Sequence, residues 1–349
     1  MKNTGRIKAR AVLALLFSFS YFLFLISCTS SNKQKDWDIV KEGGLRIVMQ
    51  IQLDEVDEDQ ASDEAKRDAR SKRSETVSEF IAAIRSRIEG FGVTNVNIKE
   101  LDSLGKIQIE MPKVKDLERV ERILLKTGKL EFWPTFNCSE VTVYLRSADE
   151  VLQNLLLSQG EKTEKPLIKL LNLESPFARA CIGSVNLSDT ALVNKYLNMP
   201  QVKAALPANL IPMWSRNPAD YDNRFIELIA IKGTDDGKAP LDGSYIAEVN
   251  AYYNRNYAYN GVKIKMNDAG TKIWAKMTEE SIGKGIAIVI DGRVNSYPTV
   301  LERIDGGMTQ ISGGFSLEEA TDLADILKGG QLPASAIILE EKVIEPKVQ

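Results

Sequence analysis

The stretch GIAIVIDGRVNSYP, from Gly285 to Pro298, decides the fold of the C-terminal half. Its apolar run, Ile286 to Ile290, is too short for a helix and rich in β-branched residues, so it predicts a buried strand. Asp291-Gly292 is a hairpin signal, because both positions of such a turn need positive φ. The return strand must end at Pro298, which has no N–H to donate to a ladder. The stretch therefore predicts a β-hairpin.

Helices flank this hairpin in the sequence. A strand at 261–266 leads into a helix whose N-cap is Asn267 or Asp268. Downstream of the hairpin, Ser316 and Glu319 form a capping box, and the helix that follows ends near Gly329. The region 261–333 therefore predicts a compact unit of alternating strands and helices.

The N-terminal part predicts a different arrangement. Hydrophobic periodicity gives the order β-α-β-β-α-β, with elements at 43–51, 77–90, 95–101, 106–111, 116–127 and 130–136. This order is that of the ferredoxin-like fold, in which two helices pack on one face of a four-stranded antiparallel sheet. The pair Gly43-Gly44 before the first strand is interpreted as a turn rather than a phosphate loop. The whole chain is therefore expected to be α+β.

Composition limits the chemistry. The 349 residues suffice for one large or two medium domains, and a net charge of −3 does not favour nucleic acid. The chain has no histidine, which excludes Ser-His-Asp and Cys-His catalysis and histidine metal ligands. We expect no metal, no other cofactor and no enzymatic activity. One alternative stays open, an envelope hydrolase that uses two carboxyl groups about 5–9.5 Å apart.

Residues 1–28 are typical of an export signal. A basic start precedes 17 uncharged residues, and Leu25-Ile26-Ser27-Cys28 resembles a lipobox. That motif implies cleavage before Cys28 and lipidation of this cysteine, with 29–36 as a polar linker. An uncleaved helical anchor is the alternative, because 17 residues are the lower limit for about 30 Å of hydrocarbon. In both cases we expect the rest of the chain in the cell envelope, on the periplasmic side of a membrane.

Two further cysteines, Cys138 and Cys181, stand far apart in the sequence. In an oxidising compartment they could form a disulfide, provided that their Cα atoms approach within about 7 Å. The alternative is two independent, partly buried thiols.

Several motifs resemble the large periplasmic domain of the SecD/SecDF family, accessory subunits of the bacterial Sec protein-export machinery. GKGIAIVIDGRVNSYP and ISGGFSLEEATDLADILKGGQLP resemble its head subdomain, and RIEGFGV, KIQIEMP and LLKTGKLEFW resemble its base. The resemblance implies a ferredoxin-like base formed by 37–136 plus 334–345. It also implies an inserted α+β head at 137–333, most clearly at 261–333.

The resemblance also implies a function. Members of the family couple proton flow through a membrane-helix bundle to the movement of exported chains, and this sequence has no later stretch that could form such a bundle. We therefore expect a membrane-tethered protein that binds exported, unfolded polypeptide or Sec translocon components, without proton-driven transport of its own. The alternative is a structural or interaction envelope lipoprotein that no longer takes part in export.

An extended peptide is usually held by a strand edge and an apolar groove. Trp133, Phe136 and Phe315 are the aromatic residues expected to line such a groove near the hinge between base and head. The alternative for each is an ordinary position in a hydrophobic core.

Overall fold

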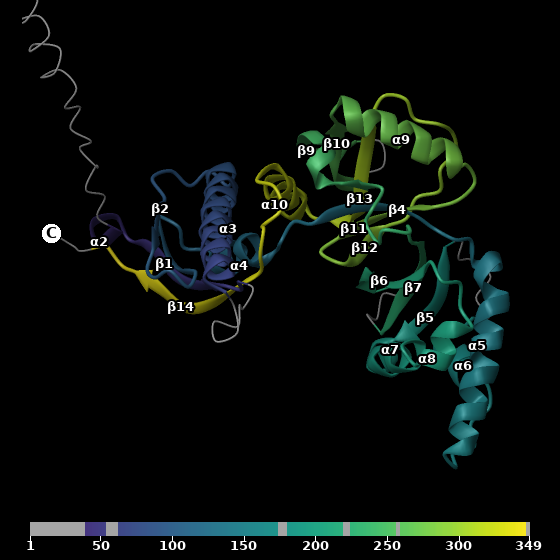
Figure 1. Ribbon diagram of the computed structural model, residues 1–349. Helices are drawn as coiled ribbons and strands as arrows, with labels where there is room; N and C mark the ends of the chain where they lie inside the picture. Colours follow the sequence, from purple (N-terminus) through teal and green to yellow (C-terminus); the bar gives the residue numbers. More distant parts are fainter. Residues whose placement is uncertain (1–38, 54–61, 174–179, 219–223, 256–258, 347–349) are drawn as a thin grey trace, which may run out of the picture.

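The computed structural model describes residues 39–53, 62–173, 180–218, 224–255 and 259–346. Figure 1 shows three parts along the molecule: a base, and a head made of two lobes. The expected signal peptide at 1–28, its Cys28 and the linker at 29–36 lie outside the described residues. Within the described ranges, no helix combines the length and the apolar character needed to cross a bilayer.

The base is a four-stranded antiparallel sheet in the order β14-β1-β3-β2. Alternate residues of β1, such as Leu45 and Ile47, are fully buried against two helices on one face of the sheet. The other face is polar and carries an ion pair between Arg46 and Glu110 at 2.8 Å. The elements are α2 (Ile39–Glu42), β1 (Gly44–Ile51), α3 (Asp63–Gly90), β2 (Asn97–Glu100), β3 (Lys106–Pro112), α4 (Leu117–Leu125) and β14 (Ala336–Ile344).

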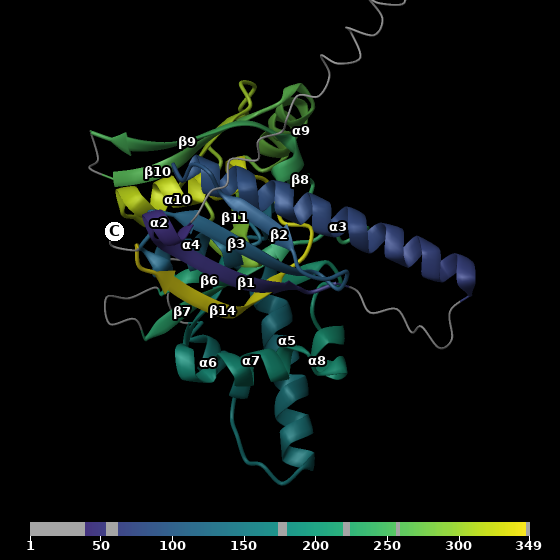
Figure 2. The same ribbon diagram turned by 90° about the vertical axis from the view of Figure 1, so that its left-hand side faces the viewer.

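Helix α3 is much longer than the core that it covers. Ser62 caps its first turn by accepting a hydrogen bond from the N–H of Ala65 at 3.2 Å. Only its C-terminal half is packed in the core, where Val77, Phe80 and Ile84 are buried, and the charged N-terminal half extends past the sheet (Figure 2).

The predicted strand at 130–136 does not belong to the base sheet, which corrects the expected sixth element. As β4 (Leu130–Pro134), it pairs with β11 (Ile286–Ile290) and β8 (Leu241–Asp242) in the head. The place beside β1 is taken by β14 from the end of the chain. All four residues from Leu130 to Trp133 are buried, so this strand needs cover on both faces, and the base sheet has a polar open face.

The head is built on a seven-stranded sheet in the order β5-β7-β6-β12-β11-β4-β8. Its two halves meet where β12 pairs with β6 through the single parallel pair Val294 and Ser215. The remaining strands of this sheet are β5 (Cys181–Asn186), β6 (Leu210–Pro218), β7 (Phe225–Lys232) and β12 (Arg293–Ser296). The narrow connection divides the head into two lobes.

The hairpin lobe comprises β4, β8 and residues 233–331. A three-stranded sheet, in the order β13-β10-β9, packs there with two helices around a core that includes Phe132 and Trp274. Asn267 is the N-cap of the first helix and Ser316 of the second, which confirms both predicted starts. Its further elements are η2 (Gly243–Tyr245), β9 (Ile246–Asn254), β10 (Tyr259–Met266), α9 (Asp268–Glu280), β13 (Met308–Phe315) and α10 (Leu317–Lys328).

The helical lobe comprises the described residues between 136 and 232. Its helices pack on β5, β7 and β6 around a second core, which includes Leu145, Leu152 and Leu228. Glu140 completes a capping box with Asn137 at the start of its long first helix. Its helices are α5 (Cys138–Ser158), α6 (Pro166–Leu171), η1 (Leu187–Asp189), α7 (Thr190–Leu197) and α8 (Pro200–Ala204).

The Gly43-Gly44 pair makes the tight turn into β1. Gly43 has φ 71° and Gly44 has φ 148°, a backbone region that favours glycine. A Cβ on Gly44 would overlap the carbonyl oxygen of Met111 on the neighbouring strand. The pair therefore serves a turn and a close strand approach.

Replacing Gly44 with alanine tests whether the close approach of the neighbouring strand requires glycine, with Gly92→Ala as the matched control. Gly92 also has positive φ, 85°, but no atom lies within 4 Å of its would-be Cβ. We expect Gly92→Ala to lower the free energy of unfolding by about 1 kcal/mol through backbone strain alone. Gly44→Ala should lower it clearly more, because strain and overlap add. Equal losses in urea unfolding would contradict the overlap.

Candidate functional site

The chain passes between base and head twice. It leaves the base at Lys126–Lys129 and returns at Gly329–Leu332. The two crossings are bonded to each other, because the N–H of Leu332 donates to the carbonyl of Thr127 at 2.8 Å. We call these crossings, with Arg87 and Asp291, the junction.

Arg87 of α3 connects both crossings. Its side chain is fully buried. Nη1 donates to the carbonyls of Ile123, at 3.2 Å, and Lys126. Nη2 donates to the carbonyls of Thr127, at 2.7 Å, and Gly330, at 2.6 Å. One guanidinium from the base therefore holds the outgoing and the returning chain together.

Two glycines make room for this side chain. Gly128 has φ 72°, and a Cβ there would lie 2.7 Å from Nη2 of Arg87. A Cβ on Gly329 would overlap Cγ of Arg87. Both crossings therefore approach Arg87 more closely than any residue with a side chain would allow.

The hairpin turn of the head completes the junction. The carboxylate of Asp291 accepts hydrogen bonds from Thr127 Oγ1 at 2.5 Å and from the N–H of Lys129 at 2.9 Å. Its own N–H donates to the carbonyl of Lys129 at 3.0 Å. Burial lowers the pKa of Arg87 to about 10, and the charge of Asp291 opposes this lowering. Arg87 therefore stays charged at neutral pH.

Helix α10 lies between the base and the rest of the head (Figure 1). Arg119 of α4 pairs with Asp322 of α10 at 2.6 Å, and Arg122 pairs with Glu318 at 3.2 Å. The guanidinium of Arg119 also stacks over the ring of Phe91, 4.2 Å from its centroid. Charged contacts thus extend the junction along α10.

The three aromatic residues predicted to line one groove lie in three different cores. Trp133 is buried between the two halves of the large sheet, and Phe315 is buried in the hairpin lobe. Phe136 is partly buried against the helical lobe. The structure therefore does not bring these three side chains together, and each of them packs in a hydrophobic core. Alternation along β4 explains part of this result, because Phe132 faces the hairpin-lobe core and its neighbour Trp133 faces the opposite side.

Cys138 and Cys181 are both free thiols in the structure. Cys138 Sγ lies 3.6 Å from Thr142 Oγ1, and the thiol of Cys181 donates to the carbonyl of Gly183 at 3.1 Å. Burial, with a further contribution from Glu227, raises the pKa of Cys181 to about 12. A disulfide between the two cysteines stays a prediction.

The head carries a cleft of about 450 Å³ at the boundary of its two lobes. Apolar side chains of α9 and two prolines line it, while lysine and glutamate side chains stand around it. The ion pair between Lys284 and Glu140, at 2.8 Å, joins the lobes there. The lining residues are Pro134, Thr135, Lys232, Gly233, Thr234, Pro240, Ile273, Lys276, Met277, Glu280, Ser281 and Lys284.

Two exposed apolar residues are connected to the lining of this cleft through the chain and a strand bridge. Ile282 follows the lining residue Ser281 and is 53% exposed. Its backbone forms a bridge with Val300, whose neighbour Leu301 is 83% exposed. Large apolar side chains that are left in water near a partly apolar cleft are a feature of contact surfaces.

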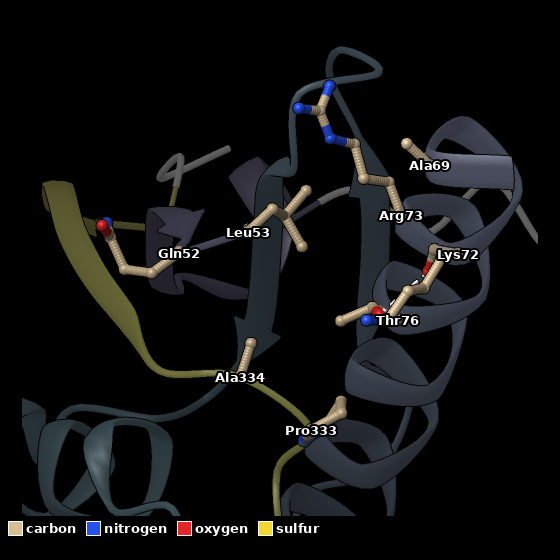
Figure 3. Close-up of a pocket in the computed structure, with 8 residues that line it drawn as sticks. All are labelled: Gln52, Leu53, Ala69, Lys72, Arg73, Thr76, Pro333 and Ala334. Atoms are coloured by element: carbon tan, nitrogen blue, oxygen red, sulfur yellow. Dashed lines mark hydrogen bonds between the residues drawn. The ribbon is translucent and has the colours of Figure 1, made fainter. Parts of the chain in front are cut away.

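A second cavity of about 450 Å³ lies in the base, where the returning crossing passes the end of β1 and the side of α3 (Figure 3). Lys72 and Arg73 line it, and both are engaged in interactions. The lining residues are Gln52, Leu53, Ala69, Lys72, Arg73, Thr76, Pro333 and Ala334.

Neither cavity offers the pair of carboxyl groups that the alternative hydrolase would need. Glu280, in the head cleft, is the one carboxylate among the residues that line the two cavities. Across the described part of the chain, no three acidic or cysteine side chains are grouped to hold a metal ion.

Comparison with known proteins shows the family to which this chain belongs. The family model for the SecDF P1 head subdomain matches residues 233–334. The model for the N-terminal part of the P1 domain of protein translocase subunit SecDF matches residues 77–135. The helical lobe lies between the two matched spans.

Curated relatives agree with the family models. The protein translocase subunit SecD of Rhodothermus marinus is 32% identical over 302 residues, which are 80% of this chain and 48% of that protein. SecD of Calditerrivibrio nitroreducens is 28% identical over 319 residues, which are 90% of this chain and 48% of that protein. A crystal structure of SecDF in its super-membrane-facing form is similar over 96% of this chain and 35% of that one, at 19% identity and a TM-score of 0.49.

The two matched spans are therefore parts of a P1 domain, residues 77–135 in its N-terminal part and residues 233–334 in its head subdomain. The chain carries a periplasmic domain of the SecD/SecDF family. It spans about half the length of the curated relatives that it matches. The activity, substrates and partners of those longer proteins can therefore only be proposed for this chain.

Replacing Arg87 tests the junction. Arg87→Ala leaves four carbonyl groups without this donor and opens a buried space, so we expect the free energy of unfolding to fall by about 3 kcal/mol or more. The control is Arg85→Ala, which removes a bond from Arg85 Nη1 to the carbonyl of Val96. We expect about 1 kcal/mol there. Equal losses in urea unfolding would contradict the role of Arg87.

Thiol labelling tests the state of the two cysteines. At pH 8, in protein purified without reductant, we expect iodoacetamide to modify Cys138 faster than Cys181, because burial keeps the Cys181 thiol protonated through its high pKa. Cys138→Ser and Cys181→Ser assign the two rates by mass spectrometry. Labelling of neither residue before reductant is added would support the disulfide and contradict two free thiols.

Proposed function

We propose that this protein assists Sec-dependent protein export by binding extended segments of exported polypeptide in the head cleft. The observation that carries the proposal is the pair of exposed apolar residues, Ile282 and Leu301, near a cleft with a partly apolar lining. An unfolded chain offers apolar side chains and unpaired backbone groups, which such a surface can bind. We assign binding, and neither catalysis nor proton-driven transport, to the described residues.

The charges around the cleft fit a polypeptide of mixed sequence. Lys284 pairs with Glu140 at 2.8 Å, and Lys276 pairs with Glu280 at 3.8 Å. Because these exposed pairs contribute little stability, they can exchange partners with charged residues of a passing chain. Apolar anchoring with exchangeable polar contacts favours broad rather than sequence-specific binding.

We further infer that the base is a ferredoxin-like βαββαβ unit whose last strand is β14. The order β14-β1-β3-β2, with α3 and α4 on one face, supports this inference. In this arrangement the head is an insertion between α4 and β14. The base would then hold both ends of the head near a membrane, with lipidated Cys28 as the anchor and Sec translocon components as neighbours.

Crosslinking in cells tests the proposed function. A photoreactive amino acid replaces Lys276 of the full chain, while an exported precursor is stalled during translocation. We expect a crosslink to the precursor, reduced at least severalfold by the double variant Ile282→Ser and Leu301→Ser. The control double variant is Leu101→Ser and Leu104→Ser, which removes two exposed leucines of the base, 48% and 62% exposed. It should leave the crosslink unchanged.

Two results would contradict the proposal. An equal crosslink in both double variants would show that Ile282 and Leu301 are not a contact surface. Capture of a stoichiometric envelope partner, with no capture of the precursor, would favour the structural or interaction lipoprotein.

A further inference from the structure

Helix α10 has two different buried faces. One face packs into the core of the hairpin lobe through Ala320, Leu323, Ala324 and Leu327. The other turns Asp322 and Asp325 toward the base, where their side chains are only 7% and 8% exposed. Aspartate is almost never this buried unless it is paired. The stability of the contact between α10 and the base therefore depends on which cations pair with these two aspartates.

Asp322 has strong partners. Arg119 donates to its Oδ1 from Nε at 2.8 Å and from Nη2 at 2.6 Å. Arg122 adds a longer ion pair to Oδ2 at 3.7 Å. Two arginines of α4 thus compensate this carboxylate.

Asp325 is compensated far less. Its ion pair among the described residues is with Lys328, on the same helix, at 3.8 Å, and Lys328 is itself half exposed. The Asp325 carboxyl carbon lies 3.5 Å from the position that a Cβ would take on Gly90, the last residue of α3. The carboxyl end of a helix carries partial negative charge, which disfavours a carboxylate beside it.

The charged groups that act on Asp325 come from three helices. Asp322 and Lys328 lie on α10, Arg119 reaches over from α4, and α3 presents its negative end. Arg87 of α3 is engaged with backbone carbonyls at the crossings. Burial raises the pKa of Asp325 above its ordinary value, Asp322 raises it further, and Lys328 and Arg119 lower it without cancelling the rise.

We propose that the contact between α10 and the base is a proton-responsive joint in which Asp325 is the responding group. The ionised carboxylate strains the contact because it lies beside a helix end and a second carboxylate, while its ion pair with Lys328 is long and Arg119 is engaged with Asp322. The neutral carboxyl group removes both repulsions while the Arg119–Asp322 pair stays in place. The joint is therefore tighter when Asp325 holds a proton. This inference does not depend on polypeptide binding.

The direction of the pH dependence follows from linkage. A carboxyl group whose pKa is higher in the closed joint than in the open one takes up a proton on closing. Closing is therefore favoured as the pH falls through that raised pKa toward the ordinary value of an aspartate, and this gain is lost as the pH rises through the raised pKa. The joint is thus tighter below the raised pKa of Asp325 than above it.

Hydrogen exchange tests the proposal on the full chain. The N–H of Leu332 donates across the crossings, so its protection, corrected for the intrinsic pH dependence of exchange, reports opening of the joint. We expect protection to increase as the pH falls from 7 to 4, by up to about tenfold per pH unit between the raised pKa of Asp325 and the ordinary pKa of an aspartate. Asp325→Asn should show high protection with little pH dependence. The control Asp235→Asn changes an exposed aspartate of the head and should behave as wild type.

A second variant keeps the test decisive if Asp325→Asn does not fold. Lys328→Gln removes the weak cation partner and leaves the carboxyl group in place. It should move the pH dependence to higher pH, because the ionised form loses stabilisation. The proposal is overturned if wild-type protection stays constant or decreases between pH 7 and pH 4. It is equally overturned if either variant keeps the wild-type pH profile.

Discussion

The bonds from Arg87 to the backbone carbonyls of both crossings are the interaction on which the two-part architecture depends. A single polypeptide crossing would leave the head free to swing. Two crossings that share one buried guanidinium, and a hydrogen bond between them, behave as one broad connection. Because carbonyl oxygens carry only partial charge, the full charge of the Asp291 carboxylate helps to offset the burial of this cation.

The hairpin turn that contains Asp291 determines contacts beyond the two strands that it joins. Asp291 adopts φ 51°, as the turn requires, and its side chain and N–H then bond to the outgoing crossing. The next strand, β12, is also the link between the two halves of the large sheet. Local turn chemistry therefore fixes how the head meets the base and how its lobes meet each other.

Local signals in the sequence predicted local structure well. The buried run at Ile286–Ile290, the N-cap Asn267 and the capping box at Ser316 are each confirmed, because neighbours in the chain determine them. The partners of a strand depend on which distant segments cover its two faces. Periodicity alone therefore could not show which of β4 and β14 belongs to the base sheet. Arg87 was missed because an arginine near a helix end normally indicates a solvated side chain. The glycine at 128 was the one local signal of something bulky there.

The sequence did not show where Trp133, Phe136 and Phe315 would lie, for a related reason. An aromatic side chain has the same pattern whether it lines a groove or fills a core, and burial area favours the core. The exposed residues near the cleft are instead Ile282 and Leu301, and only the tertiary structure reveals their exposure. Its position follows from the lobes themselves, since Lys232 and Glu140 come from one lobe and Lys276 and Lys284 from the other. Any change in the angle between the lobes would alter this cleft directly, whereas a change at the junction would move both lobes together. We therefore expect the proposed binding and the orientation of the head to depend on different contacts of this domain.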